Sequence, residues 1–394
     1  MIPNKLVNVG KHLPTAVVAN IQYGFPSKKI KVIGVTGTDG KTTTVNMIYQ
    51  ILKKSNKKVS MISTINAVIG KQVFDTGLHV TSPSSALLQK LIKQSVENGD
   101  EYLILEVTSH ALDQFRTWGI KFDIGVITNV THEHLDYHKT FDNYLNAKIK
   151  LLKNTKLAII NKDDKNFEKI ESSLNTKIFE FSLEKDADLN LRGLALNLKI
   201  LGSYNFQNAL AAAAVAINLG IDKETIKKAL ENFTSLSGRM EEIKNNKDIR
   251  VIVDFAHTPN ALENALTTLR KETKGKLIAV FGAAAERDIA KRPVMGKIAS
   301  RLADIVVLTD EDPRFEDSLK IINEIAAGCL TKGAKIDKSL FKEPNRKKAI
   351  EFAISLANKG DSVGIFGKGH EQSMNYKGEE LPWSDVTVVK EILR

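Results

Sequence analysis

The chain has 394 residues, of which 42% are hydrophobic and 26% charged, and this length favours two compact domains over a single core. No apolar run approaches the ~18–20 residues that span a bilayer, and the single cysteine, Cys329, excludes a disulfide framework and a multi-cysteine zinc site. The formal net charge of +11 comes from scattered lysines without interleaved aromatics, so it favours a solvated basic surface and an anionic substrate over nucleic acid.

The N-terminal segment, residues 1–30, precedes the first predicted strand. Its two early lysines and short apolar stretch loosely resemble a signal peptide, but Pro14, Asn20 and Gln22 interrupt the stretch. We expect a weakly amphipathic anchor or a packed surface segment, and this segment is the only part of the chain for which membrane contact is possible.

Short β-branched runs alternate with helix-length segments along the rest of the chain, a pattern typical of parallel sheets with helices on their faces. An alanine-rich helix is predicted over 205–220 and ends at Gly220. A polar stretch follows, and we place the domain boundary near residue 240. Predicted strands lie at 31–36, 59–65, 102–107, 124–128, 157–160, 251–256, 276–281, 304–309 and 362–366, and further helices at 42–54, 84–98 and 141–154. The expected fold is α/β, with a P-loop-type parallel-sheet domain over 31–240 and a smaller Rossmann-like domain over 241–394.

A glycine-rich turn between the first strand and helix has the context of a phosphate-binding loop. Its glycines let backbone N–H groups approach phosphate oxygens, Lys41 reaches the terminal phosphates, and the Thr42 hydroxyl suits Mg²⁺. The strict pattern has a glycine at the position of Val35, so this loop is a variant, and the alternative is a turn with an incidental lysine. The predicted ATP contacts are Gly37, Thr38, Asp39, Gly40, Lys41, Thr42 and Thr43.

Two further stretches carry carboxylates and histidines. Glu106 ends a predicted strand, where a carboxylate suits Mg²⁺, although an exposed strand-end glutamate would look the same. The next strand runs into a histidine-rich stretch, residues 132–138. Its spacing is not H-E-x-x-H, which disfavours a catalytic zinc site.

The loop V-T-G-T-D-G-K-T-T resembles the ATP loop of Mur ligases and folylpolyglutamate synthases, and T-N-x-x-x-x-H-L-D-Y-H resembles a Mur ligase signature. The resemblance implies that an amine is joined to a carboxylate activated by ATP as an acyl-phosphate. It also implies a catalytic group of Lys41, His134 and Lys148. Thr42, Glu106, His134 and Lys148 would surround Mg²⁺, with Lys148 carried as a carbamate; by sequence alone, Lys148 is an ordinary solvated lysine.

Motifs for the acceptor and the nucleotide follow the same resemblance. Thr81-Ser82-Pro83 and E-V-T-S-H-A-L-D-Q-F-R resemble motifs of the subfamily that adds the third residue of the cell-wall peptide. Taken alone, they are also consistent with turns and helix caps. The resemblance implies that a muramoyl-dipeptide contacts Thr81, Ser82, Thr108, Gln114 and Arg116, and that the nucleotide contacts Asn208, Arg239, Asp254 and His257.

The C-terminal motifs concern the incoming amino acid. Residues 281–293 resemble F-G-x-G-G-x-R-D-x-x-K-R-P, with Ala284 and Ala285 in place of two glycines, and contribute Arg287. Residues 311–314 resemble D-N-P-R, in which the arginine, here Arg314, grips the distal carboxylate of meso-diaminopimelate. Asp312 replaces the asparagine, and its charge is expected to repel such a carboxylate. G-K-G-H-E, with Gly367 and Glu371, would contact the same amino acid; diaminopimelate is favoured, with lysine or another amino acid as alternatives.

The resemblance covers residues 22–394. Members of this subfamily carry a separate N-terminal domain that binds UDP, and 30 residues cannot form one. We therefore expect that UDP recognition is lost or loosened, or that the acceptor differs and is lipid-linked. We expect a cytoplasmic monomer acting on a muramoyl-dipeptide and a diamino acid, with no nucleic acid; the alternatives are a folylpolyglutamate synthase-like ligase, a P-loop nucleotide switch and a basic nucleic-acid binder.

Overall fold

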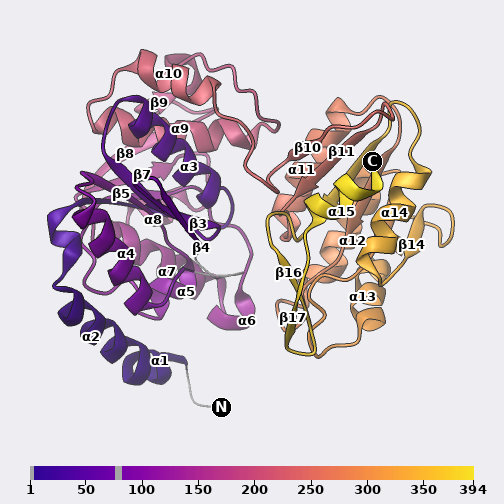
Figure 1. Ribbon diagram of the computed structural model, residues 1–394, viewed down its shortest axis with the longest axis horizontal. Helices are drawn as coiled ribbons and strands as arrows, with labels where there is room; N and C mark the ends of the chain where they lie inside the picture. The colour runs from indigo at the N-terminus through magenta and orange to yellow at the C-terminus, as the bar shows by residue number, and fades with distance from the viewer. Residues whose placement is uncertain (1–3, 76–81) are drawn as a thin grey trace. The chain divides into compact units, whose positions relative to one another are not determined.

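The computed structural model describes residues 4–75 and 82–394 and divides into two compact units (Figure 1). Unit 1 comprises Met1–Lys199 and Ser203–Phe233, and unit 2 comprises Ile200–Gly202 and Thr234–Arg394. Each unit is a mainly parallel sheet covered by helices, which confirms the predicted α/β fold class. Within the described residues, no helix is long and apolar enough to cross a membrane.

Unit 1 is built on a nine-stranded sheet in the order β4-β3-β2-β5-β1-β6-β7-β8-β9. All neighbours pair in parallel except β2–β3 and β3–β4, which are antiparallel. The central strands are buried along nearly their whole length, which explains their continuous β-branched runs. The strands are β1 (Lys31–Thr36), β2 (Val59–Ile62), β3 (Asn66–Ile69), β4 (Gln72–Asp75), β5 (Tyr102–Glu106), β6 (Phe122–Ile127), β7 (Leu157–Asn161), β8 (Lys177–Ser182) and β9 (Leu189–Asn190).

The helices of unit 1 cover this sheet, and the predicted alanine-rich helix is confirmed as α9. Its residues 209–216 are all fully buried, and it packs along α3. The chain leaves this helix through Gly220, whose φ of 79° favours glycine. The helices are α1 (Asn4–Val7), α2 (Leu13–Tyr23), α3 (Lys41–Lys54), α4 (Ser85–Glu97), α5 (Ser109–Asp113), α6 (Leu135–His138), α7 (Phe141–Lys153), α8 (Phe167–Glu171), α9 (Tyr204–Asn218) and α10 (Lys223–Glu231).

The N-terminal segment is a helix that packs on unit 1. Helix α2 lies beside α4 (Figure 1). Its inner side is fixed by Asn20, which is fully buried and donates hydrogen bonds to the carbonyl oxygens of Ala16 (2.9 Å) and Trp118 (2.7 Å). One face of the segment is therefore a packed part of unit 1.

Unit 2 has a six-stranded sheet in the order β10-β11-β15-β12-β13-β14, parallel except for β10, and a separate hairpin β16–β17. Cys329 is fully buried in α13. The strands are β10 (Glu241–Ile243), β11 (Arg250–Asp254), β12 (Leu277–Phe281), β13 (Ile305–Leu308), β14 (Leu340–Lys342), β15 (Ser362–Phe366), β16 (Ser373–Tyr376) and β17 (Glu379–Pro382). The helices are α11 (Pro259–Glu272), α12 (Lys291–Leu302), α13 (Ser318–Leu330), α14 (Arg346–Leu356) and α15 (Asp385–Ile392).

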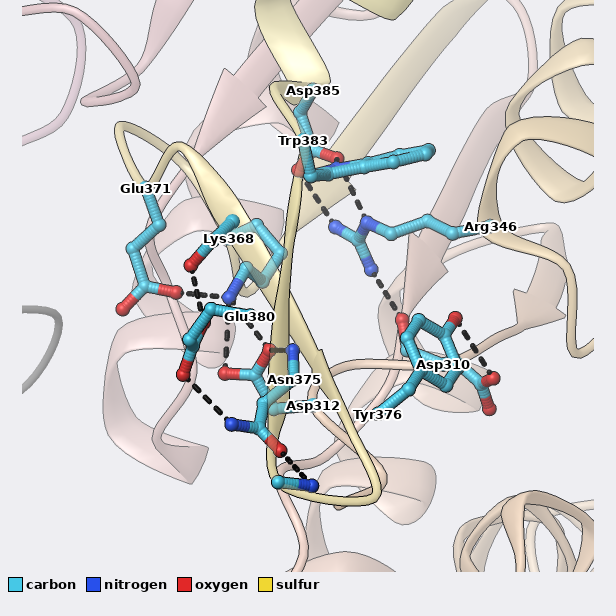
Figure 2. Close-up of polar contacts among 12 residues, drawn as sticks. Asp310, Asp312, Arg346, Lys368, Glu371, Asn375, Tyr376, Glu380, Trp383 and Asp385 are labelled. Atoms are coloured by element: carbon cyan, nitrogen blue, oxygen red, sulfur yellow. Dashed lines mark hydrogen bonds and ion pairs between the residues drawn. The ribbon is translucent and has the colours of Figure 1, made fainter.

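A buried ion pair joins α14 to α15. The Arg346 guanidinium donates from Nε to Asp385 Oδ1 (2.8 Å) and from Nη2 to Asp385 Oδ2 (2.7 Å), and both side chains are fully buried (Figure 2). The same guanidinium also donates to the carbonyl oxygens of Asp310 and Phe366. Arg346 thus fixes the C-terminal helix to the ends of two sheet strands.

Replacing Arg346 by alanine leaves the Asp385 carboxylate buried without its cation. We expect the free energy of unfolding of the full chain to fall by about 3–5 kcal/mol, as for other broken buried pairs. The neighbouring Lys347 pairs with Glu391 at 3.6 Å, with both side chains half exposed, and Lys347→Ala should cost less than about 1 kcal/mol. Equal losses in urea unfolding of the two variants would contradict the assigned role of Arg346.

Candidate active site

The loop between β1 and α3 runs so close to its neighbours that two of its residues must be glycine. A Cβ on Gly37, whose φ is 153°, would lie 1.8 Å from Thr128 Oγ1. A Cβ on Gly40, whose φ is 81°, would lie 2.1 Å from Asn208 Oδ1. The glycines are therefore required by both backbone conformation and close approach.

The loop leads into the N-terminus of α3. Among the described residues, no side chain caps this helix, because its N-cap is Gly40, whereas Ser84 and Thr140 cap α4 and α7. The Lys41 ammonium lies over the loop and donates to the carbonyl oxygens of Gly37 (3.1 Å) and Thr38 (2.8 Å). A helix N-terminus with an adjacent lysine is a site where phosphate groups bind.

Side chains at the end of β6 hold the loop in place. The Asn129 carbonyl oxygen accepts from Thr38 N (2.8 Å), its Oδ1 accepts from Asp39 N (3.0 Å), and Thr128 Oγ1 donates to the Asp39 carbonyl oxygen (2.7 Å). From α9, the buried Asn208 lies against Gly40 and donates to Asn205 Oδ1 (3.0 Å). Asn208 thus lies at the phosphate loop. Thr128 and Asn129 begin the T-N-x-x-x-x-H-L-D-Y-H motif, but they were not among the predicted nucleotide contacts.

Thr42 and Glu106 meet directly below the loop. The Glu106 carboxylate is 2% exposed and accepts hydrogen bonds from Thr42 Oγ1 (3.0 Å) and from Thr64 N (3.1 Å). The sheet order explains this meeting, because β5 lies between β1 and β2 and all three run in parallel. A hydroxyl and a carboxylate side by side form a donor set that suits Mg²⁺. Thr64 was not among the predicted site residues, although it lies within a predicted strand; in the structure it follows the end of β2.

Lys148 is buried, so its interpretation as an ordinary solvated lysine was wrong. It is 1% exposed, donates from Nζ to the Gly37 carbonyl oxygen (2.6 Å), and lies 4.5 Å from the centre of the Tyr144 ring. Burial lowers the pKa of Lys148 well below its ordinary value, and the nearby Lys41 lowers it further. Helix α7 therefore places beside the phosphate loop an amine whose charged form is destabilised by burial.

Three histidine rings, those of His110, His134 and His138, lie close together at α6. His134 is its N-cap in the left-handed conformation, with a φ of 56°, and its ring packs edge-on against His110 at 4.7 Å between centres. Its Nδ1 lies 3.9 Å from Glu133 Oε1. Burial lowers the pKa of His138 to about 4, so this ring is neutral and shares a hydrogen bond with Ser109 Oγ (3.1 Å).

The predicted acceptor residues are brought together around Ser82. The Arg116 guanidinium donates to the Ser82 carbonyl oxygen (2.8 Å), and Ser82 Oγ accepts from Thr108 N (3.1 Å). Gln114 interacts with the hydroxyl of Tyr137, and Thr81 lies outside the described residues. A further contact was not predicted: Asn8, from the N-terminal segment, donates to Asp113 Oδ2 (2.9 Å) and to Tyr137 Oη (3.2 Å).

In unit 2, the predicted nucleotide residues surround Phe255. The Arg239 guanidinium lies 4.4 Å from the centre of the Phe255 ring, and His257 Nδ1 lies 3.0 Å from the Phe255 carbonyl oxygen. The buried Asp254 accepts from Met240 N (2.7 Å) and Ala256 N (2.9 Å), although burial raises its pKa. In this structure, Asp254 fixes the turns on either side of Phe255.

A buried cluster in unit 2 links two of the predicted amino-acid motifs (Figure 2). Lys368 Nζ donates to both Asp312 oxygens (2.9 and 3.0 Å) and forms an ion pair with Glu371. Burial lowers the pKa of Lys368, but Glu371 and Asp312 outweigh it and the pKa is raised. The Asp312 charge, expected to repel a substrate carboxylate, is thus balanced by Lys368.

Burial raises the pKa of Glu371 to about 8, although Lys368 acts in the opposite direction. One lysine therefore pairs with two carboxylates, so these three side chains lack one positive charge when both carboxylates are ionised. An ammonium group would supply that charge.

Arg314 and Gly367 complete this region. Arg314 has a φ of 47°, donates from its backbone N to the Asn375 carbonyl oxygen (3.0 Å), and lies 3.5 Å from Glu286. A Cβ on Gly367 would lie 2.1 Å from Glu311 Oε2, so glycine is required there. Arg287 is half-buried, and Glu286 takes the left-handed conformation in the loop where alanines replace glycines.

Comparisons with known proteins agree with this geometry. Residues 35–216 match the model of the Mur ligase middle domain, and residues 238–369 match that of the Mur ligase glutamate ligase domain. A UDP-N-acetylmuramoyl-L-alanyl-D-glutamate–2,6-diaminopimelate ligase from Clostridium tetani is 39% identical over 96% of this chain and 80% of its own length.

Solved structures give the same result. A ligase of that name superposes with a TM-score of 0.61 and 29% identity, covering 92% of this chain and 78% of the other. Folylpolyglutamate synthase from Mycobacterium tuberculosis, complexed with ADP and AMPPCP, has a TM-score of 0.72 at 16% identity over 90% and 92% of the two chains, a likeness of fold alone. The chain is thus an ATP-dependent amide ligase. It belongs to the Mur ligase family.

A comparison of Gly40→Ala with Gly220→Ala should separate the effect of steric contact with Asn208 from the effect of backbone strain. Gly220 has a similar φ, 79° against 81°, but a Cβ there would have no neighbour within 4 Å. Gly220→Ala should lose about 1 kcal/mol of stability, whereas Gly40→Ala should lose more, because its Cβ meets Asn208, and should also weaken ATP binding at least about tenfold. Equal ATP affinities of the two variants in calorimetry would show that the approach of Asn208 is not needed for binding.

Proposed function

We propose that the chain forms an amide bond between the carboxylate of a muramoyl-dipeptide and an amino group of meso-diaminopimelate, with ATP hydrolysed to ADP and phosphate. The observation that carries this proposal is the phosphate loop, where glycines, Lys41 and the N-terminus of α3 lie beside the Thr42–Glu106 pair. A carboxylate is a poor electrophile, and phosphoryl transfer gives it a good leaving group.

The donor set beside the loop fits Mg²⁺. Thr42 and Glu106 supply a hydroxyl and a carboxylate at hydrogen-bond distance from each other, and we propose that His134 and Lys148 complete the surroundings. When bound, Mg²⁺ would supply positive charge that offsets the phosphate oxygens.

The chain's own residues position and neutralise the reactants. Lys41 holds the terminal phosphates, and its ammonium offsets the charge that develops during transfer. Lys148 is proposed to become a carbamate, in which a neutral amine adds CO₂ and releases a proton; its burial beside Gly37 lowers the pKa of the amine, which supports this reaction. Arg116, held by Ser82, is the proposed clamp for an acceptor carboxylate.

The amino-acid site is proposed to lie at the Lys368 cluster. Glu371 would receive the ammonium group that the cluster lacks, and Arg314 would bind the distal carboxylate, a group that lysine does not have. The ion pair between Asp312 and Lys368 supports diaminopimelate as the substrate. Lys368 balances the negative charge of Asp312, which would otherwise repel the distal carboxylate of diaminopimelate.

Phosphate release from ATP, measured with UDP-muramoyl-dipeptide and a panel of amino acids, tests this function. Release should require both the acceptor and diaminopimelate, and Lys41→Ala should reduce it more than about 100-fold, the scale of losing a main electrostatic group. Arg314→Ala should raise the amino-acid concentration needed at least about tenfold and spare ATP binding. Arg301→Ala, an exposed arginine of the same unit, serves as the control.

Each alternative predicts another outcome of this assay. Hydrolysis that no amino acid stimulates would indicate a nucleotide switch. Stimulation by glutamate with a folate acceptor would indicate a folylpolyglutamate synthase-like ligase, and an unchanged amino-acid requirement in Arg314→Ala would refute the assigned specificity.

The pKa of Glu371 gives a pH dependence. This carboxyl group is protonated below about pH 8 and ionised above it, and only the ionised form attracts an ammonium group. The affinity of the enzyme for diaminopimelate should therefore rise with pH through about 8, by roughly tenfold between pH 7 and pH 9. Glu371→Gln should bind weakly with a flat pH profile, while Glu379→Gln, at an exposed position of β17, should keep the parent profile. A steep profile in Glu371→Gln would assign the titration to another group.

A further inference from the structure

The N-terminal segment exposes a row of apolar side chains on its outer face. Leu6, Val9, Val18 and Ile21 are 64%, 49%, 62% and 66% exposed. In the part of unit 1 that the structure describes, the other exposed large apolar side chains are Val73 (65%) and Trp118 (38%). Four of these six side chains therefore lie on one short helical segment, which is more than scattered surface residues would give.

A wide turn in the segment aligns this row. The backbone N–H of Leu13 donates to the carbonyl oxygen of Asn8, five residues earlier, so the turn holds one residue more than an ordinary helical turn. Val9 and the exposed Pro14 consequently share a face, and Val18 and Ile21 follow at helical spacings of four and three residues. The row runs along α1 and α2 at the outer edge of unit 1 (Figure 1).

The charged side chains of the segment itself have one sign. Residues 1–38 contain five lysines and neither aspartate nor glutamate. The side chains of Lys11, Lys28 and Lys29 are exposed. An apolar helix face flanked by lysines is complementary to a membrane surface that carries anionic lipid headgroups.

A second copy of the chain fits this face less well. A stable dimer buries roughly 1,200–2,000 Å², more than a single narrow row of aliphatic side chains provides. Two copies would also bring the lysines of the two segments close together, and like charges repel each other. The charge pattern thus favours lipid over self-association.

We propose that the outer face of residues 6–21 docks on an anionic lipid bilayer, with Val9, Pro14, Val18 and Ile21 at the headgroup boundary and lysines contacting the headgroups. The inner face of the same segment carries Asn8, which is bonded to Asp113 and Tyr137. Docking therefore brings the proposed acceptor residues of unit 1 to the bilayer surface. This binding is independent of the amide-forming activity, and the two are measured separately.

Sedimentation of the full chain with vesicles tests the proposal. Vesicles of phosphatidylcholine with phosphatidylglycerol should bind the protein at least tenfold better than phosphatidylcholine alone, and added salt should weaken the binding. Val18→Glu with Ile21→Glu should lower binding to anionic vesicles at least tenfold, whereas Val73→Glu, an equally exposed change on β4, should not. ATP hydrolysis and thermal unfolding of these variants should match the parent, because the side chains are exposed.

A second variant guards against a folding defect. Lys28→Gln with Lys29→Gln keeps the apolar row and should lower binding roughly fivefold for each lysine removed. Equal binding to neutral and anionic vesicles, or unchanged binding of both double variants, would overturn the proposal. A dimer seen in sedimentation velocity and abolished by the two glutamates would also overturn it and assign the face to a second copy.

Discussion

The close approach of the phosphate loop to the end of β6 and to α9 is the constraint on which the rest of unit 1 depends. Side-chain atoms of Thr128 and Asn208 lie so close to Gly37 and Gly40, respectively, that a Cβ atom on either glycine would overlap with them. Asn208 reaches the loop because α9 packs along α3 through a run of buried alanines. Small side chains in that helix thus set the geometry of a loop more than 160 residues earlier in the chain.

Burial of charged groups has a different consequence at each site. Arg346 and Asp385 form a bidentate buried pair of one cation and one carboxylate, so this pair serves as a structural link. Lys148 donates a hydrogen bond to the backbone carbonyl oxygen of Gly37, and burial lowers its pKa. Lys368 lies between these cases, because it pairs with two carboxylates and leaves one of them, Glu371, with a raised pKa. The number of carboxylates per buried cation therefore separates structural pairs from groups suited to chemistry or binding.

The N-terminal segment connects an outer face to an interior network. Asn8 and Asn20 bond inward to unit 1, while Val18 and Ile21 face outward. Packing explains the first set, and the proposed contact with lipid explains the second. The amino-acid composition could not distinguish the inward-facing residues from the outward-facing ones, because both kinds lie within the same short apolar stretch.

The sequence by itself determined the parallel α/β architecture, because buried strands of β-branched residues and amphipathic helices have strong local periodicities. It also determined the phosphate loop, whose glycines and lysine are contiguous. The short and exposed strands were not predicted: β17 is exposed throughout, so no alternation of buried and exposed residues marks it. The β3–β4 hairpin adds antiparallel strands at the sheet edge, and its strands of four residues each are too short to give a strong local signal.

Tertiary structure decided the states of individual side chains. Lys148 looks solvated in sequence, and its burial depends on how α7 packs beside the loop at Gly37. The charge of Asp312 was expected to be unbalanced, but Lys368, 56 residues later, lies within 3.0 Å of it. Thr64 and Asn8 joined the sites through contacts 42 and 105 residues apart in the chain. Local periodicity carries no information on such distances, because they arise from the order of strands in the sheet and the packing of helices on it.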